Sequence, residues 1–391
     1  MVELPYIKQC DPHAGYHAWW VEIDAAVIEA LQKERYLLGR ELELFEQEFS
    51  NWQEASHTIG VANGTDALLL SLQALDVEPG TAVLTPSFTA VATVNAIVRS
   101  GALPVYVDVN VETGTLCPQS VERTLKRLTE SSSPLKPAAL VVVHLYGFPA
   151  EMSRLCALAE EYAIPIIEDV AQAHGARYRN KRVGTFGKLA AFSFYPTKNL
   201  AALGDAGAVV TGDARLADRV RTLRQYGWDE ARQSQEIGMN SRLDELQAAI
   251  LRIKLRHINQ ETRRRRKIAE QYAKGLQRTG LVPILSLPET EPVFHQFVVR
   301  TQERASLQAF LEERQIQTAI HYPLAVHQQP AYEKGYQDLL NQGLIEPLAG
   351  TETLANKVLS LPMYPQLSDS AVERVVEACT EWSQQQESPS E

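Results

Sequence analysis

The sequence lacks the features that identify several classes of protein. Its cysteines are far apart, so none has the paired spacing of a zinc site or a redox centre. No apolar run is long enough to span a bilayer, and the acidic, aromatic N-terminus does not resemble a signal peptide. The nine histidines do not cluster as metal ligands do. We therefore expect no membrane partner, no metal and reduced thiols in the cytoplasm. The cysteines are Cys10, Cys117, Cys156 and Cys379.

Positive charge is also scarce. The chain has 38 lysines and arginines against 48 aspartates and glutamates, for a net charge of −10. A field of this sign attracts neither nucleic acid nor an anionic membrane, so we expect neither as a partner. The one basic cluster, residues 263–267, lies in a helical pattern where successive side chains turn by about 100°. The charges are thereby spread around the helix, which predicts a solvated surface.

Two common nucleotide-binding motifs are absent as well. No Gly-x-Gly-x-x-Gly opens a helix after the first strand, which argues against a dinucleotide site. Gly187 and Lys188 resemble the end of a P-loop. That loop, however, requires glycine where Arg182 stands and serine or threonine where Leu189 stands.

What the chain does have is a regular alternation of short apolar runs and amphipathic segments. Continuous valine, isoleucine and alanine runs between helical segments indicate a mainly parallel sheet with helices on both faces. A first helix is expected over residues 22–38, with Gly39 as its stop. We expect strands at residues 59–62, 82–85, 105–108, 139–144, 165–168, 189–194 and 208–211, and helices at residues 66–75, 90–99 and 152–162.

The C-terminal part has a different pattern. A long helix is expected over residues 241–276, and after it strands and helices no longer alternate. We expect strands at residues 293–299 and 318–321, and helices at residues 305–314 and 371–382. The sequence therefore predicts a large α/β domain over residues 1–255 and a smaller α+β domain over residues 256–391.

Asp169 and Lys198 lie at the ends of two predicted strands and indicate one kind of chemistry. A pyridoxal phosphate (PLP) enzyme needs a lysine that forms a Schiff base with the cofactor aldehyde. It also needs an acid that keeps the pyridine nitrogen protonated. Taken alone, an aspartate after a strand can be a helix cap and a lysine is usually exposed. Because the two residues follow one another at the ends of two predicted strands, a cofactor site is favoured over a helix cap and an exposed lysine.

Other residues at strand ends fit the same cofactor. Gly64 and Thr65 open an apolar helix, where free N–H groups and the helix dipole suit a phosphate; the alternative is a plain cap. Phe88 either stacks on a heterocycle or packs in the core. Gln172 is spaced to donate a hydrogen bond to a ring oxygen, and Ser193 completes the set. The order of these residues along the chain favours a PLP site.

Together these motifs resemble those of the sugar aminotransferases of the DegT/DnrJ/EryC1/StrS family, which are fold-type I PLP enzymes. The resemblance implies an α/β fold with a large, mainly parallel sheet domain and a smaller C-terminal α+β domain. It runs almost from end to end of the chain. The matching motifs lie at residues 36–39, 61–68, 168–175, 192–199, 238–249, 295–300 and 321–323.

The resemblance implies which residues hold the cofactor ring. Lys198 would be the Schiff-base lysine and Asp169 the partner of the ring nitrogen. Gln172 would contact the ring oxygen, and Phe88 would stack on the ring face.

The resemblance also implies how the phosphate is held. Gly64, Thr65 and Ser193 would bind it within one subunit. Asn240 matches an asparagine that reaches the phosphate from a second subunit, so a homodimer with shared active sites is expected.

The activity that the resemblance implies is transfer of the amino group of L-glutamate to a nucleotide-linked keto-sugar. His321 and Tyr322 match a segment near the sugar. Residues 240–255 and 321–332 are most similar to relatives that aminate C3 of dTDP-linked 3-keto-6-deoxyhexoses. By contrast, residues 10–20 are unusual and are expected to shape the nucleotide or sugar end of the site.

Three alternatives have the same fold. One is an aminotransferase for C4 of a UDP-, GDP- or dTDP-linked 4-keto-sugar, and another is a noncatalytic PLP-fold regulator. The third, a PLP-dependent sugar dehydratase, fits poorly, because such relatives carry histidine at the position of Lys198.

Overall fold

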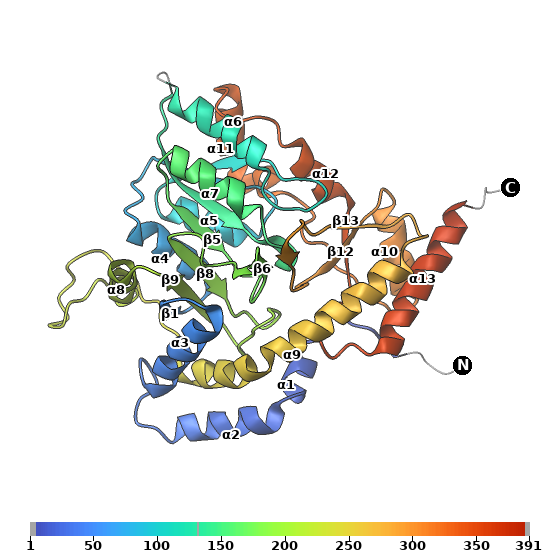
Figure 1. Cartoon of the computed structure of the whole chain (residues 1–391), viewed down its shortest axis with the longest axis horizontal. Helices are drawn as coiled ribbons and strands as arrows, with labels where there is room; N and C mark the ends of the chain where they lie inside the picture. The colour runs from blue at the N-terminus through green and yellow to red at the C-terminus, as the bar shows by residue number, and fades with distance from the viewer. Residues whose placement is uncertain (1–4, 131–132, 388–391) are drawn as a thin grey trace.

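The computed structural model describes residues 5–130 and 133–387 (Figure 1). Its helices are α1 (Pro12–His17), α2 (Trp20–Leu31), α3 (Arg40–Gln53), α4 (Gly64–Ala74), α5 (Val91–Arg99), α6 (Pro118–Thr129), α7 (Met152–Glu161), α8 (Ala214–Leu223), α9 (Glu245–Gly275), α10 (Arg304–Glu313), α11 (Pro330–Asn341), α12 (Ala349–Lys357) and α13 (Asp369–Glu387). Its strands are β1 (His57–Val61), β2 (Ala82–Pro86), β3 (Leu103–Val107), β4 (Pro137–Val143), β5 (Ile166–Asp169), β6 (Arg177–Tyr178), β7 (Lys181–Arg182), β8 (Leu189–Ser193), β9 (Gly207–Thr211), β10 (Val282–Pro283), β11 (Thr290–Glu291), β12 (Phe297–Arg300) and β13 (Val358–Leu361).

A seven-stranded sheet forms the centre of the fold, in the order β1-β9-β8-β5-β4-β2-β3. Its neighbours from β8 through β3 pair in parallel, whereas β9 pairs antiparallel with both β8 and β1. Parallel neighbours need crossover connections. Helices supply them for the pairs β2-β3, β2-β4 and β4-β5, whereas the β6-β7 hairpin lies in the connection from β5 to β8. The prediction of a mainly parallel sheet is confirmed, and β9 is its antiparallel member.

Side chains of the central strands alternate between two hydrophobic clusters, because successive residues of a strand point to opposite faces. Leu84 and Val142 join one cluster with apolar residues of α3, α6 and α7. Val83 and Val141 join the other with residues of α4 and α8. Helices therefore cover both faces, as the sequence predicts.

Most of the expected element positions are confirmed, with ends that differ by at most two residues in the large sheet. The strand expected at residues 293–299 begins only at Phe297, because Phe294 turns the chain with a φ of 45°. The strand expected at residues 318–321 is wrong. In the described part of the chain this segment makes one isolated bridge, from Ala319 to Ser360. The chain turns away from the sheet here, and the His321 carbonyl accepts a hydrogen bond from the Tyr146 hydroxyl.

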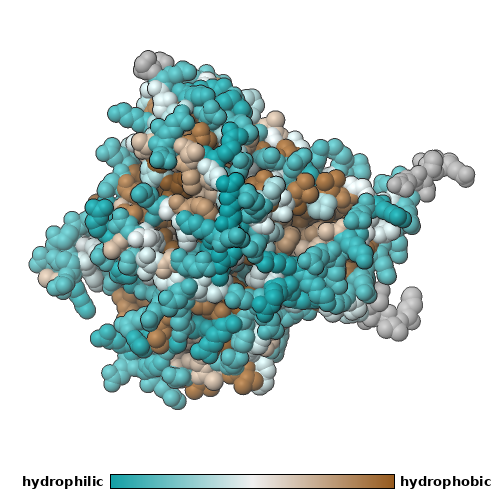
Figure 2. Space-filling model, viewed as in Figure 1, coloured by the Kyte–Doolittle hydropathy of each residue, from teal (hydrophilic) through white to brown (hydrophobic). Residues whose placement is uncertain are grey.

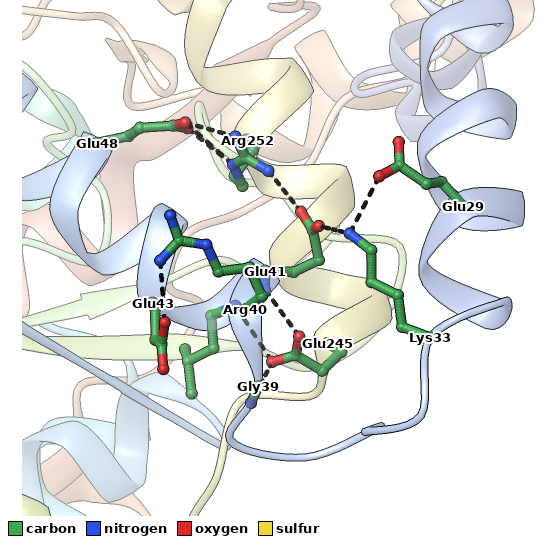
Figure 3. A network of polar contacts seen from close by, with 10 residues as sticks. Glu29, Lys33, Gly39, Arg40, Glu41, Glu43, Glu48, Glu245 and Arg252 are labelled. Carbon is green, nitrogen blue, oxygen red and sulfur yellow. Dashed lines mark hydrogen bonds and ion pairs between the residues drawn. The ribbon is translucent and has the colours of Figure 1, made fainter.

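The helix expected over residues 22–38 also ends earlier than predicted. α2 stops well before Gly39, which caps the start of α3 instead of ending a helix. The carboxylate of Glu245 accepts hydrogen bonds from the N–H groups of Gly39 and Glu41 at 2.8 Å and of Leu42 at 3.2 Å (Figure 3). A helix start leaves such groups without intrahelical acceptors. The acceptor comes from a distant part of the chain, so the local pattern does not reveal it.

Ion pairs surround this cap (Figure 3). Arg252 of α9 donates to Glu41 and to Glu48 of α3 at 2.6 Å each. Lys33, just after α2, pairs with Glu41 and with Glu29. The network joins α2 and α3 to the first turns of α9, and so holds the segment that precedes α9.

α9 crosses the predicted domain boundary at residue 255. Its first half packs on α2 and α3, and its second half reaches α13 and the three-stranded sheet β10-β12-β13 (Figure 1). Contacts also cross the boundary elsewhere: α11 lies against β3, and Ile7 forms a parallel bridge with Ile316. The division into residues 1–255 and 256–391 stays a prediction.

Two features of residues 5–130 and 133–387 bear on possible partners. No helix among them has the length and apolar character to cross a bilayer. No group of three or more histidine, cysteine, aspartate or glutamate side chains in this part of the chain could hold a metal ion.

Replacing Glu245 with alanine should destabilise the protein by about 2–3 kcal/mol, because three buried N–H groups lose their acceptor. Urea-induced unfolding followed by circular dichroism measures the effect. Glu43→Gln is the matched control, because Glu43 lies in the same region but forms only an exposed pair with Arg40. Equal unfolding midpoints for Glu245→Ala and the control would contradict the capping role.

Candidate active site

Six of the predicted site residues line one cavity of about 210 Å³ at the carboxyl ends of the parallel strands. Asp169 is the last residue of β5 and Ser193 the last of β8, and these strands are parallel neighbours. In open α/β sheets, ligands bind at this edge. The six residues are Gly64, Thr65, Asp169, Gln172, Ser193 and Lys198.

The start of α4 forms one wall of this cavity. Asn63 caps the helix by accepting a hydrogen bond from the N–H of Asp66 at 2.8 Å. The N–H groups of Gly64 and Thr65 belong to the first turn, where the helix itself offers no acceptor. A Cβ on Gly64 would lie 2.6 Å from the Cβ of Ser193, so only glycine allows this close approach. The wall therefore offers backbone donors and a serine hydroxyl to an anion.

Asp169 lies deep in the same cavity and is 6% exposed. Its Oδ2 accepts a hydrogen bond from the Thr93 hydroxyl at 2.8 Å, and its Oδ1 accepts one from the N–H of Ala171 at 3.1 Å. Burial raises the pKa of the Asp169 carboxyl, although these donors and Lys198 oppose the rise. Both hydrogen-bond donors are neutral, so the carboxylate can still accept a cationic partner from a ligand.

Lys198 lines the same cavity as Asp169 and lies beyond the end of β8. Burial lowers the pKa of its amine to about 8, and the negative charge of Asp169 limits the drop. About a tenth of the amine is therefore uncharged at pH 7, far more than for an exposed lysine. An uncharged buried lysine can act as a nucleophile and as a proton acceptor.

Gln172 connects this cavity to the segment that carries His321 and Tyr322. Its Oε1 accepts a hydrogen bond from the N–H of Tyr146 at 2.7 Å, and its Nε2 donates to the Tyr322 hydroxyl at 3.0 Å. Burial raises the pKa of the Tyr322 hydroxyl to about 12, so this group stays protonated. The second N–H of the Gln172 amide is left to donate elsewhere.

Among the described residues, four predicted site residues do not line the cavity. Phe88 is fully buried, with its ring edge-on to the rings of Tyr146 and Tyr322. Tyr322 contacts the site through Gln172. The His321 ring hydrogen-bonds to the hydroxyl of Ser360 at 2.8 Å, and burial lowers its pKa to about 4. The fourth of these residues, Asn240, is exposed in the segment before α9.

Sequence reasoning missed the residues that support Asp169. The neighbouring Glu168 points to the other face of the sheet and is completely buried. It hydrogen-bonds to the His144 ring at 3.0 Å and accepts from the N–H groups of Gly184 at 2.6 Å and of Phe186 and Gly187 at 2.7 Å. The available sequence signal was the pair of adjacent acids at the end of a strand. Because successive side chains of a strand point to opposite faces, the two acids are expected to have different roles.

These residues fit pyridoxal phosphate. The start of α4 and Ser193 offer donors to its phosphate. Asp169 offers a buried carboxylate to its ring nitrogen, and Lys198 offers an amine to its aldehyde. The donor set matches the chemical groups of the cofactor one by one, in a single cavity.

Relatives of known function extend over nearly the whole chain. A dTDP-3-amino-3,4,6-trideoxy-alpha-D-glucose transaminase of Streptomyces venezuelae is 44% identical over 388 residues, which cover 98% of this chain and 97% of the relative. The erythromycin biosynthesis sensory transduction protein EryC1 of Saccharopolyspora erythraea is 44% identical over 380 residues, covering 96% of this chain and 98% of the relative.

The fold is also similar to that of solved structures. The crystal structure of S. venezuelae DesV in complex with a ketimine intermediate matches with a TM-score of 0.89 and 44% identity, over 97% of this chain and 99% of that one. Residues 20–380 match the model of the DegT/DnrJ/EryC1/StrS aminotransferase family. This chain therefore belongs to the DegT/DnrJ/EryC1/StrS aminotransferase family.

Proposed function

We propose that this protein is a PLP-dependent aminotransferase that moves the amino group of L-glutamate to C3 of a dTDP-linked 3-keto-6-deoxyhexose. Glutamate leaves as 2-oxoglutarate, and the ketone oxygen of the sugar leaves as water. The observation that carries the proposal is that Lys198 and Asp169 line one cavity together with the backbone donors at the start of α4.

The proposed roles follow from the environment of each residue. When bound, pyridoxal phosphate supplies an electron sink for the substrate carbon that loses its proton. The Lys198 amine is partly uncharged because burial lowers its pKa to about 8, so its Nζ can accept that proton and return it. Asp169 offers a carboxylate to the cationic ring nitrogen of the cofactor. The 2.8 Å hydrogen bond from the Thr93 hydroxyl fixes the orientation of this carboxylate. Both residues have a low-dielectric setting, which strengthens these interactions.

The choice of C3 rests on the transaminase of Streptomyces venezuelae, whose name specifies a 3-amino sugar and which matches this chain almost end to end. Amination at C4 of a UDP-, GDP- or dTDP-linked sugar is the alternative, because a rotation of the sugar in the pocket changes which carbon is presented. The proposed sugar-side residues are His321 and Tyr322, since Gln172 links Tyr322 directly to the cavity.

The proposed assembly is a homodimer in which Asn240 reaches the partner's cofactor phosphate. Asn240 is exposed, and Ile237 in the same segment is 92% exposed, which is unusual for a large apolar side chain. Exposed apolar residues also gather along α2, at the lower edge of the view in Figure 2. Such patches often mark protein interfaces. The exposed apolar residues in α2 and just after it are Trp20, Val21, Ile28, Leu31, Tyr36 and Leu37.

The proposed compartment is the cytoplasm. All four cysteines are free in the structure. Free thiols are typical of proteins in reducing compartments.

A panel of nucleotide sugars tests the function. With glutamate as donor, the protein should aminate dTDP-3-keto-6-deoxyhexoses at least about tenfold faster than 4-keto-sugars, with products located by NMR. Lys198→Ala should lose more than about a thousandfold in rate, because the proton carrier is gone. Lys188→Ala, at the opposite and exposed end of β8, is the control. Selective C4 products would replace the C3 proposal, and cofactor binding without turnover would favour the regulator.

Cofactor uptake should depend on pH through Lys198. Its uncharged fraction rises through a pKa of about 8, so the rate at which cofactor-free protein takes up PLP should rise from pH 7 and level off above pH 9. Asp169→Asn should move this midpoint down, because the negative charge that favours the protonated amine is lost. Absorbance spectra follow the uptake. A rate that still climbs beyond pH 10 would contradict the assigned pKa.

Mixed dimers test the shared site. Subunits with Lys198→Ala, mixed with subunits carrying Asn240→Ala, should form hybrids in which one of the two sites is intact. Random exchange would then restore about a quarter of wild-type activity. Lys198→Ala protein mixed with itself provides the blank. No recovery, with hybrids demonstrated and Asn240→Ala impaired alone, would rule out the shared arrangement.

A further inference from the structure

A group of buried polar contacts outside the cavity joins the end of β2 to the short helix η2 (Val326–Gln328). Ser87 follows β2 directly and is completely buried, and His327 is 2% exposed. The N–H of Val326 donates to the Ser87 carbonyl at 3.0 Å, and the N–H of His327 donates to the Ser87 hydroxyl at 3.0 Å. The Nδ1 of the His327 ring lies 2.8 Å from the same hydroxyl. Three hydrogen bonds therefore hold η2 to a single residue.

The pattern of these hydrogen bonds assigns the proton of the His327 ring. The Ser87 oxygen already accepts from the N–H of His327, so the hydroxyl proton is left to be donated to Nδ1. The ring proton is then on Nε2, which lies 3.3 Å from a carboxylate oxygen of Glu352. Burial lowers the pKa of the imidazole, although Glu352 and Asp108 oppose the drop. The ring is therefore mainly neutral at pH 7, with Nδ1 as an acceptor.

On one side, Ser87 leads into the wall of the active-site cavity. It is followed by the buried Phe88 and then by Thr89, which lines the cavity. The Thr89 hydroxyl lies 3.0 Å from the hydroxyl of Thr93, and Thr93 donates to Asp169. A shift of Ser87 would consequently displace residues that form and support the cavity.

On the other side, His327 belongs to the segment that carries the proposed sugar residues. Tyr322 accepts a hydrogen bond from Gln172 at 3.0 Å, and its ring lies edge-on to that of Phe88. The segment is thus attached to the cavity wall at Tyr322 and again at His327. Between these two points Leu324 is 50% exposed. A loop with fixed ends and an exposed middle is suited to contact a ligand.

We propose that His327 is a positioning residue for the keto-sugar, because it fixes the segment of His321 and Tyr322 against the cavity wall through Ser87. The inference rests on the proposed function, in which His321 and Tyr322 lie on the sugar side. His327 is too deeply buried to contact a substrate, so it acts through its neighbours. Support of this kind holds a binding segment in its productive geometry.

The reacting lysine is held by other contacts. The N–H of Lys198 donates to the Tyr195 carbonyl at 2.8 Å, and the amide of Asn199 donates to the Val293 carbonyl at 3.0 Å. Neither contact involves Ser87 or η2. We therefore expect a change at His327 to affect the keto-sugar more than the amino donor, which must reach Lys198.

Two amide substitutions separate the two sides of the His327 ring. Asparagine places its Oδ1 at the position of Nδ1, so it can still accept from the Ser87 hydroxyl. Glutamine places its amide at the position of Nε2, so it can still donate to Glu352 but leaves the Ser87 hydroxyl without an acceptor. A role in filling space would not distinguish the two variants, because both remove the ring.

His327→Gln and Ser87→Ala should each raise the keto-sugar KM about five- to tenfold, the size of one lost buried hydrogen bond. Calorimetry on the PLP-loaded protein should show the same loss of affinity for dTDP-glucose, a nucleotide sugar without a ketone. The glutamate KM, and all values for His327→Asn, should stay within about twofold of the wild type. His57→Gln is the matched control, because His57 lies in β1 and β2 lies near the opposite edge of the sheet.

Unchanged keto-sugar KM and dTDP-glucose affinity in His327→Gln and Ser87→Ala would overturn the positioning role. Equal defects in His327→Asn and His327→Gln would overturn it too, since the contact with Ser87 would then be irrelevant. A parallel rise in both KM values would assign a general support of the cofactor instead. If His327→Gln does not fold, Ser87→Ala decides the outcome. Binding of dTDP-glucose that depends on His327, in a protein that aminates no keto-sugar, would support the positioning role and reject the proposed function.

Discussion

Burial of an aspartate and a lysine at the same edge of a parallel sheet is the constraint on which the site depends. Asp169 ends β5, and Lys198 follows the end of its parallel neighbour β8. Burial shifts both groups toward their neutral forms, raising the pKa of Asp169 and lowering that of Lys198 to about 8. A carboxylate that needs a cationic partner and an amine that is partly uncharged are both suited to pyridoxal chemistry. Burial is therefore the main cause of both pKa shifts.

The rest of the sheet keeps this pair in place. Glu168 sits one residue before Asp169 and points to the opposite face, where it binds the His144 ring and three backbone N–H groups. These donors satisfy the buried Glu168 carboxylate and so fix the end of β5 on one face of the sheet. On the other face, the Thr93 hydroxyl fixes Asp169. Gly64 allows the start of α4 to approach Ser193 closely. Rigid support of this kind keeps a site organised before its ligand binds.

α9 connects the parts of the molecule that the chain order separates. Near its start, Glu245 caps α3 and Arg252 binds two glutamates of that helix. Further along, Lys254 and Arg265 line a small cavity that Lys198 also lines. A single long helix thus fixes the segment that carries the exposed Asn240 and also reaches the active-site lysine.

The sequence by itself determined the mainly parallel sheet, the positions of its strands and the candidate cofactor residues, because hydrophobic periodicity and residues at strand ends are local signals. The family motifs also identified Lys198 and Asp169. Only the tertiary structure decided that Gly39 starts a helix, that Phe88 is fully buried, and that Arg265 lines the same small cavity as Lys198. These features depend on side chains brought together from distant parts of the chain. No local pattern records such contacts, since their energies arise only when the helices and the sheet have packed.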